Sequence, residues 1–240
     1  MSSGQCAVCW KEGGSPCSTC KSCHYCSEEC QKSDWKSHKL LCHLIATETE
    51  RPSPSHIRAI YFPDSKPTPE LVWIPCIEND EIPEEPNVPA SEPIDDLLGN
   101  KFCVHVRRVD WDDGGKKSTP RPIEVYHRDN FLLDESPPTA SLEAAVRHYG
   151  QEKVGWRGPL VVVAVSVEDG PHEDPINRYV DATLADFRSI IHYSLHYKDK
   201  FEEVEKKEEI VPGIIALTRA MGSGMVFSHD NLPGPSRRRE

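Results

Sequence analysis

Short apolar runs separated by turn-forming residues make up most of the chain. The apolar run Leu160–Val167 is typical of a strand that is buried on both faces of a sheet. In Phe102–Val109 apolar and polar residues alternate, which indicates a half-buried strand. Other runs that predict strands are Ile57–Phe62, Leu71–Ile77, Ile123–His127 and, nearer the C-terminus, Val211–Thr218 and Gly224–Ser228.

Two stretches carry apolar residues at helical spacing. Ser141 begins the first, and Gly150 ends it. Thr183 begins the second, because Thr183 and Asp186 have the spacing of a capping box. The predicted apolar stripes are Leu142, Ala145, Val146 and Tyr149 in the first helix, and Leu184, Phe187, Ile191 and Leu195 in the second.

Strands and helices follow one another without regular alternation, so residues 57–230 are predicted to form an α+β domain with a mixed or antiparallel sheet. Residues 78–96 are rich in Pro and Glu and predict a loop that ends in one helical turn at Asp95–Gly99. Residues 47–56 are a predicted linker, and residues 231–240 a predicted disordered tail.

Residues 1–46 lack this pattern and hold most of the cysteines. Their large apolar side chains are too few to form a core, so a bound metal has to take its place. Cysteine and histidine occur in pairs separated by two or three residues, a spacing typical of tetrahedral zinc sites. The pairs are Cys6 and Cys9, Cys17 and Cys20, Cys26 and Cys30, and His38 and Cys42.

These pairs predict two zinc ions, and the spacing alone leaves open how the pairs combine. Cys23 lies between two pairs and could replace a neighbouring cysteine as a ligand. A disulfide framework is the other explanation of dense cysteines. However, the N-terminal residues form no apolar signal, so we expect an intracellular protein, of the nucleus or the cytoplasm, with reduced thiols. Ser27 and Ser33 predict the N-caps of two short helices, each presenting one ligand pair.

The formal net charge of −11 restricts the partners. Thiolates outnumber the positive charges of zinc, so metal binding makes the chain more acidic still. Such a charge repels phosphate backbones and argues against nucleic acid as a partner. The sequence also lacks an apolar stretch long enough to cross a membrane, so no membrane partner is expected.

The order of ligands from residue 6 to residue 42 resembles the MYND zinc finger, over less than a fifth of the chain. Tyr25 matches the aromatic residue that the family places before its fifth ligand. The resemblance implies that the first pair combines with the third and the second with the fourth. One ion would be bound by Cys6, Cys9, Cys26 and Cys30, and the other by Cys17, Cys20, His38 and Cys42.

The same resemblance implies a function. Gln31 and Trp35 match family residues that line a shallow apolar groove for peptides. We therefore expect a module that binds short proline-containing motifs of partner proteins, in transcriptional regulation. Such motifs are already stiff and lose little entropy on docking. The alternative that Trp35 only covers the zinc site stays open.

The remaining domain resembles a group of uncharacterised fungal MYND proteins, in Arg128–Phe131, Trp156–Pro159 and Asp186. This resemblance implies no activity. The alternative to an interaction module is thus an enzyme of unknown activity in this domain, which the finger would target. Candidates for such a site are His105, His127 and Asp129.

Known catalytic signatures are missing from the sequence. The strand and tyrosine motifs of a SET methyltransferase, which some MYND proteins carry, are not found. His192 and His196 have metal-binding spacing, but residue 193 is Tyr where a metalloprotease needs Glu. We expect these histidines on the flank of a helix, and we expect the chain not to be an enzyme.

Overall fold

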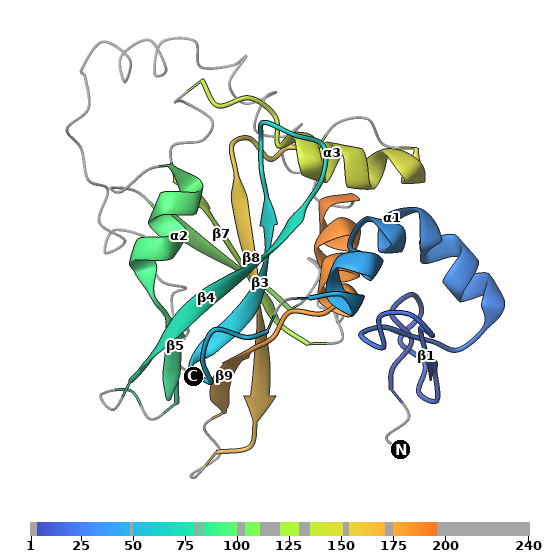
Figure 1. The fold of residues 1–240 in the computed structure, drawn as a ribbon, viewed down its shortest axis with the longest axis horizontal. Helices are drawn as coiled ribbons and strands as arrows, with labels where there is room; N and C mark the ends of the chain where they lie inside the picture. Colours follow the sequence, from blue (N-terminus) through green and yellow to red (C-terminus); the bar gives the residue numbers. More distant parts are fainter. Residues whose placement is uncertain are drawn as a thin grey trace, which may run out of the picture. The chain divides into compact units, whose positions relative to one another are not determined.

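The structure is a computed structural model that describes residues 4–48, 50–79, 82, 84–99, 104–110, 121–129, 135–150, 154–170 and 175–195. All of them belong to the unit Met1–Lys198, in which a cysteine-rich segment leads into an antiparallel sheet (Figure 1). The strands predicted over 211–218 and 224–228, and the predicted tail 231–240, lie outside the described residues.

The main sheet of the described part has seven strands. They are β3 (His56–Phe62), β4 (Glu70–Glu78), β5 (Asn87–Pro89), β6 (Val104–Val109), β7 (Ile123–Arg128), β8 (Leu160–Glu168) and β9 (Ile176–Val180).

Strand β8 lies at the centre of the sheet. The order is β5-β4-β3-β8-β7-β6, and β9 pairs with the second half of β8. Every one of these pairings is antiparallel, which confirms the predicted fold class. Residues 160–165 of β8 are fully buried, as expected for a continuous apolar run with both faces covered.

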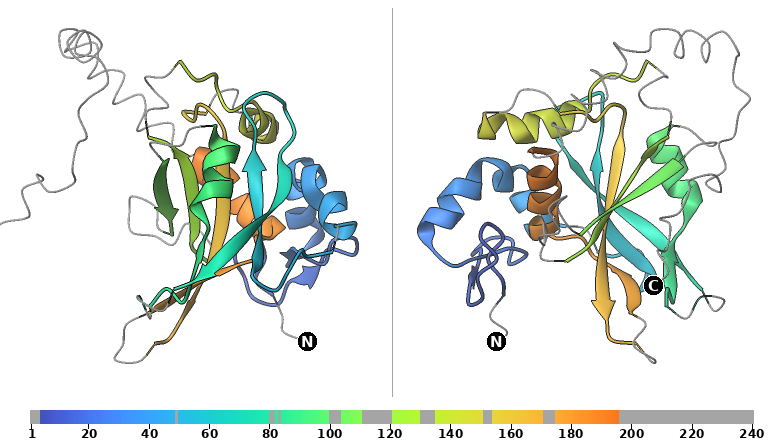
Figure 2. Two further views of the ribbon diagram at one scale, coloured as in Figure 1. Left: turned by 60° about the vertical axis from the view of Figure 1, so that its left-hand side comes forward. Right: turned by 180° about the vertical axis from the view of Figure 1, so that it is seen from behind.

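Helices cover the two faces of the sheet (Figure 2). On one face, Ile94 and Leu98 of α2 (Ser91–Leu98) pack in a cluster with Val161 and Val163 of β8. The other face carries a helix described over residues 184–195, whose Phe187 ring stacks on Phe62 at 5.8 Å between centroids. The helix predicted from Ser141 to Gly150 is formed by two elements, α3 (Ala140–Val146) and the 3-10 turn Arg147–Tyr149.

The predicted loop over residues 78–96 is wrong, because it contains β5 and the first part of α2. Strand β5 exists through tertiary pairing: it pairs with β4, and the Asn87 side chain joins it to β9. Asn87 Nδ2 donates to the Tyr179 carbonyl at 3.0 Å, and Tyr179 N donates to Asn87 Oδ1 at 3.2 Å. Composition does not show such a long-range contact.

The alternation in β6 describes its burial only in part. Val109 is buried, but Val106 is 41% exposed. The reason is that β6 ends the strand order, where fewer elements cover the sheet. None of the helices in the described ranges is long and apolar enough to span a bilayer.

A buried carboxylate borders the cluster beneath α2. Glu124 accepts hydrogen bonds from Tyr179 Oη at 2.8 Å and Tyr126 Oη at 3.3 Å, and lies 3.6 Å from Arg108 Nη1. Burial raises the pKa of Glu124, and the Tyr179 hydrogen bond and the Arg108 charge oppose this only in part.

We predict that Glu124→Gln changes how stability depends on pH. With a raised pKa, the folded protein binds this proton more tightly than the unfolded chain does. The contribution of Glu124 to the free energy of unfolding is therefore fully present below its pKa in the unfolded chain, about 4.3. It is lost as the pH rises through its pKa in the folded protein. Urea unfolding across this range should show the stability of the native protein falling relative to the variant. A constant or rising difference would contradict the prediction.

Candidate metal centre

One continuous helix, α1 (Glu28–Ala46), follows Cys26, and the two short helices predicted there are wrong. Ser27 is its N-cap, with Oγ accepting from Cys30 N at 3.3 Å. Ser33 is not a cap, because its hydroxyl donates to the Cys30 carbonyl inside the helix at 3.2 Å. The single helix carries Cys30, His38 and Cys42, so it connects both predicted zinc sites. The segment before it pairs as a short hairpin, β1 (Ser15–Pro16) with β2 (His24–Tyr25).

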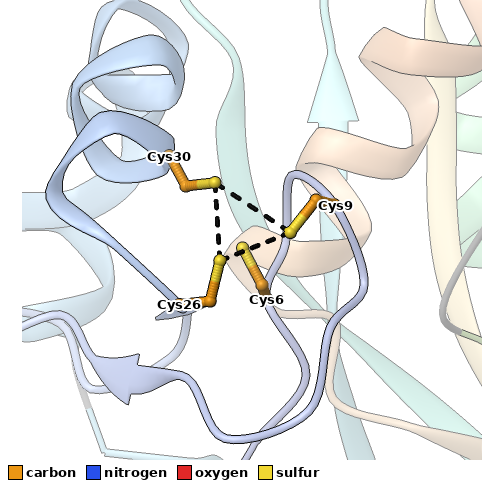
Figure 3. A group of neighbouring side chains, drawn as sticks. All are labelled: Cys6, Cys9, Cys26 and Cys30. Atoms are coloured by element: carbon orange, nitrogen blue, oxygen red, sulfur yellow. Dashed lines mark hydrogen bonds between the residues drawn. The ribbon is translucent and has the colours of Figure 1, made fainter.

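Four sulfurs converge at the start of α1. Cys6, Cys9, Cys26 and Cys30 point toward one another from the N-terminal loop, the residues before α1 and its first turn (Figure 3). The distances between the Cys9, Cys26 and Cys30 sulfurs are 3.4, 3.6 and 4.0 Å. A zinc–sulfur length of about 2.3 Å implies tetrahedral edges of about 3.8 Å, so the group fits zinc. These sulfurs are far beyond the disulfide length of about 2.05 Å.

The second group lies deeper. Cys17, Cys20, His38 and Cys42 are all buried, and their ligand atoms lie within 4.8 Å of one another. Cys17 Sγ is 3.9 Å from Cys42 Sγ, and Cys20 Sγ is 3.8 Å from His38 Nε2. These separations again match the edges of a zinc tetrahedron. The structure therefore brings together the two interleaved sets that the resemblance implied.

The thiols of the first site need a cation to ionise together. Burial alone would raise the pKa of Cys6, but backbone N–H groups, including those of Cys26 and Cys9, lower it to about 6. The neighbouring sulfurs of Cys9 and Cys30 in turn raise the pKa of Cys26 to about 12. Once one thiolate has formed, the next therefore costs more. A zinc dication removes this conflict and supplies the cross-link that replaces a core.

His38 is held as a neutral ligand. Burial lowers its pKa, although Asp34 opposes this. Its Nε2 faces Cys20, while Nδ1 is 2.7 Å from Tyr25 Oη, which donates to Asp34 Oδ2 at 2.7 Å. With Nε2 on the metal, Nδ1 carries the proton and donates it to Tyr25. This chain of hydrogen bonds fixes the ring orientation, as supporting groups do at zinc sites.

Cys23 belongs to neither four-ligand group. It is fully buried, and its sulfur lies within 4.8 Å of ligand atoms of Asp34 and His38. This group of three shares His38 with the second zinc site. Burial raises the pKa of its thiol well above the usual range, with Asp34 adding to the effect. Because Cys23 lies outside both four-ligand groups and is fully buried, it packs beside the ligand His38.

The comparisons with known proteins agree with this geometry. The family model described as MYND finger matches residues 6–42. Residues 6–42 are a MYND finger. Its two ligand sets are two zinc sites, and a MYND finger is a protein-interaction module and not itself a catalytic one.

Several curated relatives share this finger. N-lysine methyltransferase SMYD2-A of Danio rerio is 44% identical over 54 residues, which are 22% of this chain and 12% of that protein. Ubiquitin carboxyl-terminal hydrolase 19 of Arabidopsis thaliana is 59% identical over 39 residues, 16% of this chain and 6% of that protein. The zinc finger MYND domain-containing protein 10 homolog of Drosophila melanogaster is 49% identical over 37 residues, 15% of this chain and 8% of that protein.

This chain thus matches at most 12% of the length of these relatives. The match to the methyltransferase covers the finger region and carries no information on the activity of the sheet domain. No solved structure shows significant similarity to the chain.

The MYND finger packs directly on the helix of residues 184–195. Ser22 Oγ accepts a hydrogen bond at 3.0 Å from Leu184 N. Leu184 N belongs to the first helical turn, where backbone donors have no partner within the helix itself. The Trp10 ring meets His192 edge-on at 5.9 Å. His192 therefore packs against the finger, and its predicted companion His196 lies outside the described residues.

A buried ion pair links the second zinc site to the same helix. Arg188 Nη1 lies 3.6 Å from Asp34 Oδ1, and both side chains are largely buried. The Arg188 guanidinium lies over the Tyr149 ring at 4.5 Å, and the Tyr149 hydroxyl forms a short hydrogen bond with Ser37 on α1. The sequence patterns did not identify these residues as part of the site. Asp34 lies four residues before His38, which is a visible signal, but nothing in the sequence identifies its distant partner Arg188.

The candidate catalytic residues do not line the cavity that the described part of the sheet domain contains. That cavity, about 790 Å³ between β4, β5 and β9, is lined by Cys76, Arg121 and Tyr179 among others, and not by His105, His127 or Asp129. Burial raises the pKa of Cys76 to about 11 and raises that of Tyr179. Both therefore stay protonated at neutral pH and are poor general bases. Cys103 lies outside the described residues.

We predict that paired substitutions distinguish the interleaved ligand sets from sequential ones. Native mass spectrometry of the full chain should give two zinc ions, and one ion for Cys9→Ser/Cys26→Ser, since both substitutions affect the same site. Cys9→Ser/Cys17→Ser should bind none, because it damages both sites. One retained ion in this second variant would instead indicate sequential pairing.

We predict that Arg188→Met costs about 3 kcal/mol of stability, because it leaves the buried Asp34 carboxylate without its cation. Urea unfolding measures this loss, and the variant should still bind two zinc ions. The matched control is Arg178→Met, whose pair with Glu168 is about half exposed and should be worth less than about 1 kcal/mol. Equal effects would show that the Tyr25 hydrogen bond alone compensates Asp34.

Proposed function

We propose that the MYND finger binds short proline-containing motifs of partner proteins through Gln31 and Trp35 on α1. The observation that supports this most directly is the exposure of a large aromatic ring on a rigid helix. Trp35 is 48% exposed, and Gln31 lies one turn before it on the same side of α1. An exposed indole beside an amide is suited to pack against proline and to hydrogen-bond a peptide backbone.

The zinc sites explain why this surface is rigid. Cys30 fixes the first turn of α1, and His38 and Cys42 fix its middle, so Gln31 and Trp35 lie between two anchored points. Trp35 also stacks on the ligand His38, with 5.7 Å between ring centroids and 27° between planes. The inner face of the indole thus covers the zinc ligand while its remaining surface stays open. A preorganised surface loses little entropy when a peptide binds.

We also propose the context of this activity. Partners would act in transcriptional regulation inside the cell, in the nucleus or the cytoplasm, where reducing conditions keep the zinc ligands as thiols. The proposed parts are the finger over 1–46, a linker over 47–56 and a domain over 57–230. The end of α1 at Ala46 and the start of β3 at His56 support the limits of the linker.

A second function, an enzyme in the sheet domain, has weaker support. The cavity of about 790 Å³ has room for a small molecule. Its lining arginines are paired, however: Arg51 with Asp181 at 2.5 Å and Arg121 with Asp186 at 2.5 Å. Burial acts to lower the pKa of Arg121, but the hydrogen bond and charge of Asp186, with the charge of Asp181, together hold that pKa above its usual value. These pairs serve the structure first, so we propose the interaction module.

We predict that Trp35→Ala abolishes peptide binding while two zinc ions stay bound. Peptides would be selected from a displayed library of short sequences with a fixed central proline, and fluorescence anisotropy would measure their affinity for the zinc-loaded chain. Loss of a central exposed tryptophan contact costs about 2 kcal/mol or more, roughly thirtyfold in affinity. The matched control is Leu44→Ala, which removes a 45% exposed side chain about 180° around the same helix.

The two variants separate the possible roles of Trp35. Equal weakening by Leu44→Ala and Trp35→Ala would contradict a site at Trp35. If Trp35→Ala loses both its zinc ions and its peptide binding, the ring acts only as a cover for the metal site.

A further inference from the structure

The exposed face of α1 carries a row of lysines around Trp35. Lys32, Lys36 and Lys39 are all exposed, and their spacing of four and three residues places them on one side of the helix. Lys39 follows Trp35 by one turn and Lys32 precedes it by slightly less. A peptide that covers the indole ring therefore comes within reach of this lysine row.

The positive charges of these lysines contrast with the net negative charge of the whole chain. The chain has a formal net charge of −11, and a zinc ion bound by four thiolates carries a charge of about −2. Lys32 pairs with Glu28 at 2.8 Å, but both side chains are about 70% exposed and such a pair is weak. Lys36 and Lys39 form no ion pair with any residue in the described ranges. The second half of the face is therefore a local positive surface beside Trp35.

We propose that the partner motif carries carboxylates next to its proline, and that Lys36 and Lys39 bind them. This inference rests on the proposed function and specifies its partner class: an acidic, proline-containing segment of another protein. Charge complementarity supports it, because a neutral or basic peptide would leave the lysines unused and would gain nothing from their attraction. The carboxylates of the bound peptide face the C-terminal half of α1, because Glu28 and Glu29 make the first turn of the helix negative and repel them.

The test compares one peptide with its uncharged twin. The tightest binder from the fixed-proline library is synthesised with its Asp and Glu residues and again with Asn and Gln in their place. On the native zinc-loaded chain, the acidic form should bind about tenfold more tightly than the twin. Raising the salt concentration should reduce this advantage, because exposed charges are screened.

Substitution of the lysines should remove the difference. In Lys36→Gln/Lys39→Gln the acidic peptide and its twin should bind within about twofold of each other, as a coupling between these charges requires. The matched control is Lys66→Gln, which neutralises an exposed lysine in the loop between β3 and β4 and should keep the full difference.

The outcomes separate this proposal from the one on which it depends. A twin that binds the native chain as well as the acidic peptide, or a difference that persists in Lys36→Gln/Lys39→Gln, overturns the proposal; the lysines then only balance the charge of the zinc sites. If the uncharged twin binds the native chain and loses this binding in Trp35→Ala, the proposed function stays intact. A library without any binder that depends on Trp35 overturns both.

Discussion

Zinc coordination is the constraint on which the N-terminal part of this protein depends. Residues 1–46 have too few large apolar side chains to hold a fold, and two tetrahedral groups of ligands replace that core. Helix α1 contributes Cys30 to one group and His38 with Cys42 to the other. The metal sites thereby orient the helix, and Trp35 stacks on the ligand His38 while about half of its surface stays exposed to solvent.

The MYND finger is also a packing partner of the sheet domain. Its buried Asp34 faces the ligand His38 through Tyr25 and faces Arg188 of the helix over residues 184–195 on the other side. One carboxylate thus belongs both to the support of a zinc ligand and to the contact with the neighbouring domain.

This division of α1 gives the proposed function its physical basis. The inner side of the helix is occupied by ligands and by the contact with the domain, so it is fixed. The outer side combines an aromatic ring, an amide and lysines on that fixed support. A surface of this kind suits the proposed recognition of a stiff segment by shape and by charge. In the sheet domain, the cavity-lining Arg51 and Arg121 are paired with Asp181 and Asp186, and burial raises the pKa of Cys76.

The sequence by itself determined the elements whose information is local. The spacing from Cys6 to Cys42 specified the zinc ligands, because a tetrahedral site needs paired donors of fixed kinds. The apolar run at Leu160–Val167 likewise specified a central strand. Tertiary structure decided what depends on distant partners. Strand β5 forms because it hydrogen-bonds with β4 and with the backbone of Tyr179, and Asp34 becomes a contact to the domain only where folding places Arg188 beside it. Pairing energy of this kind arises between residues far apart in the chain, and no local pattern encodes it.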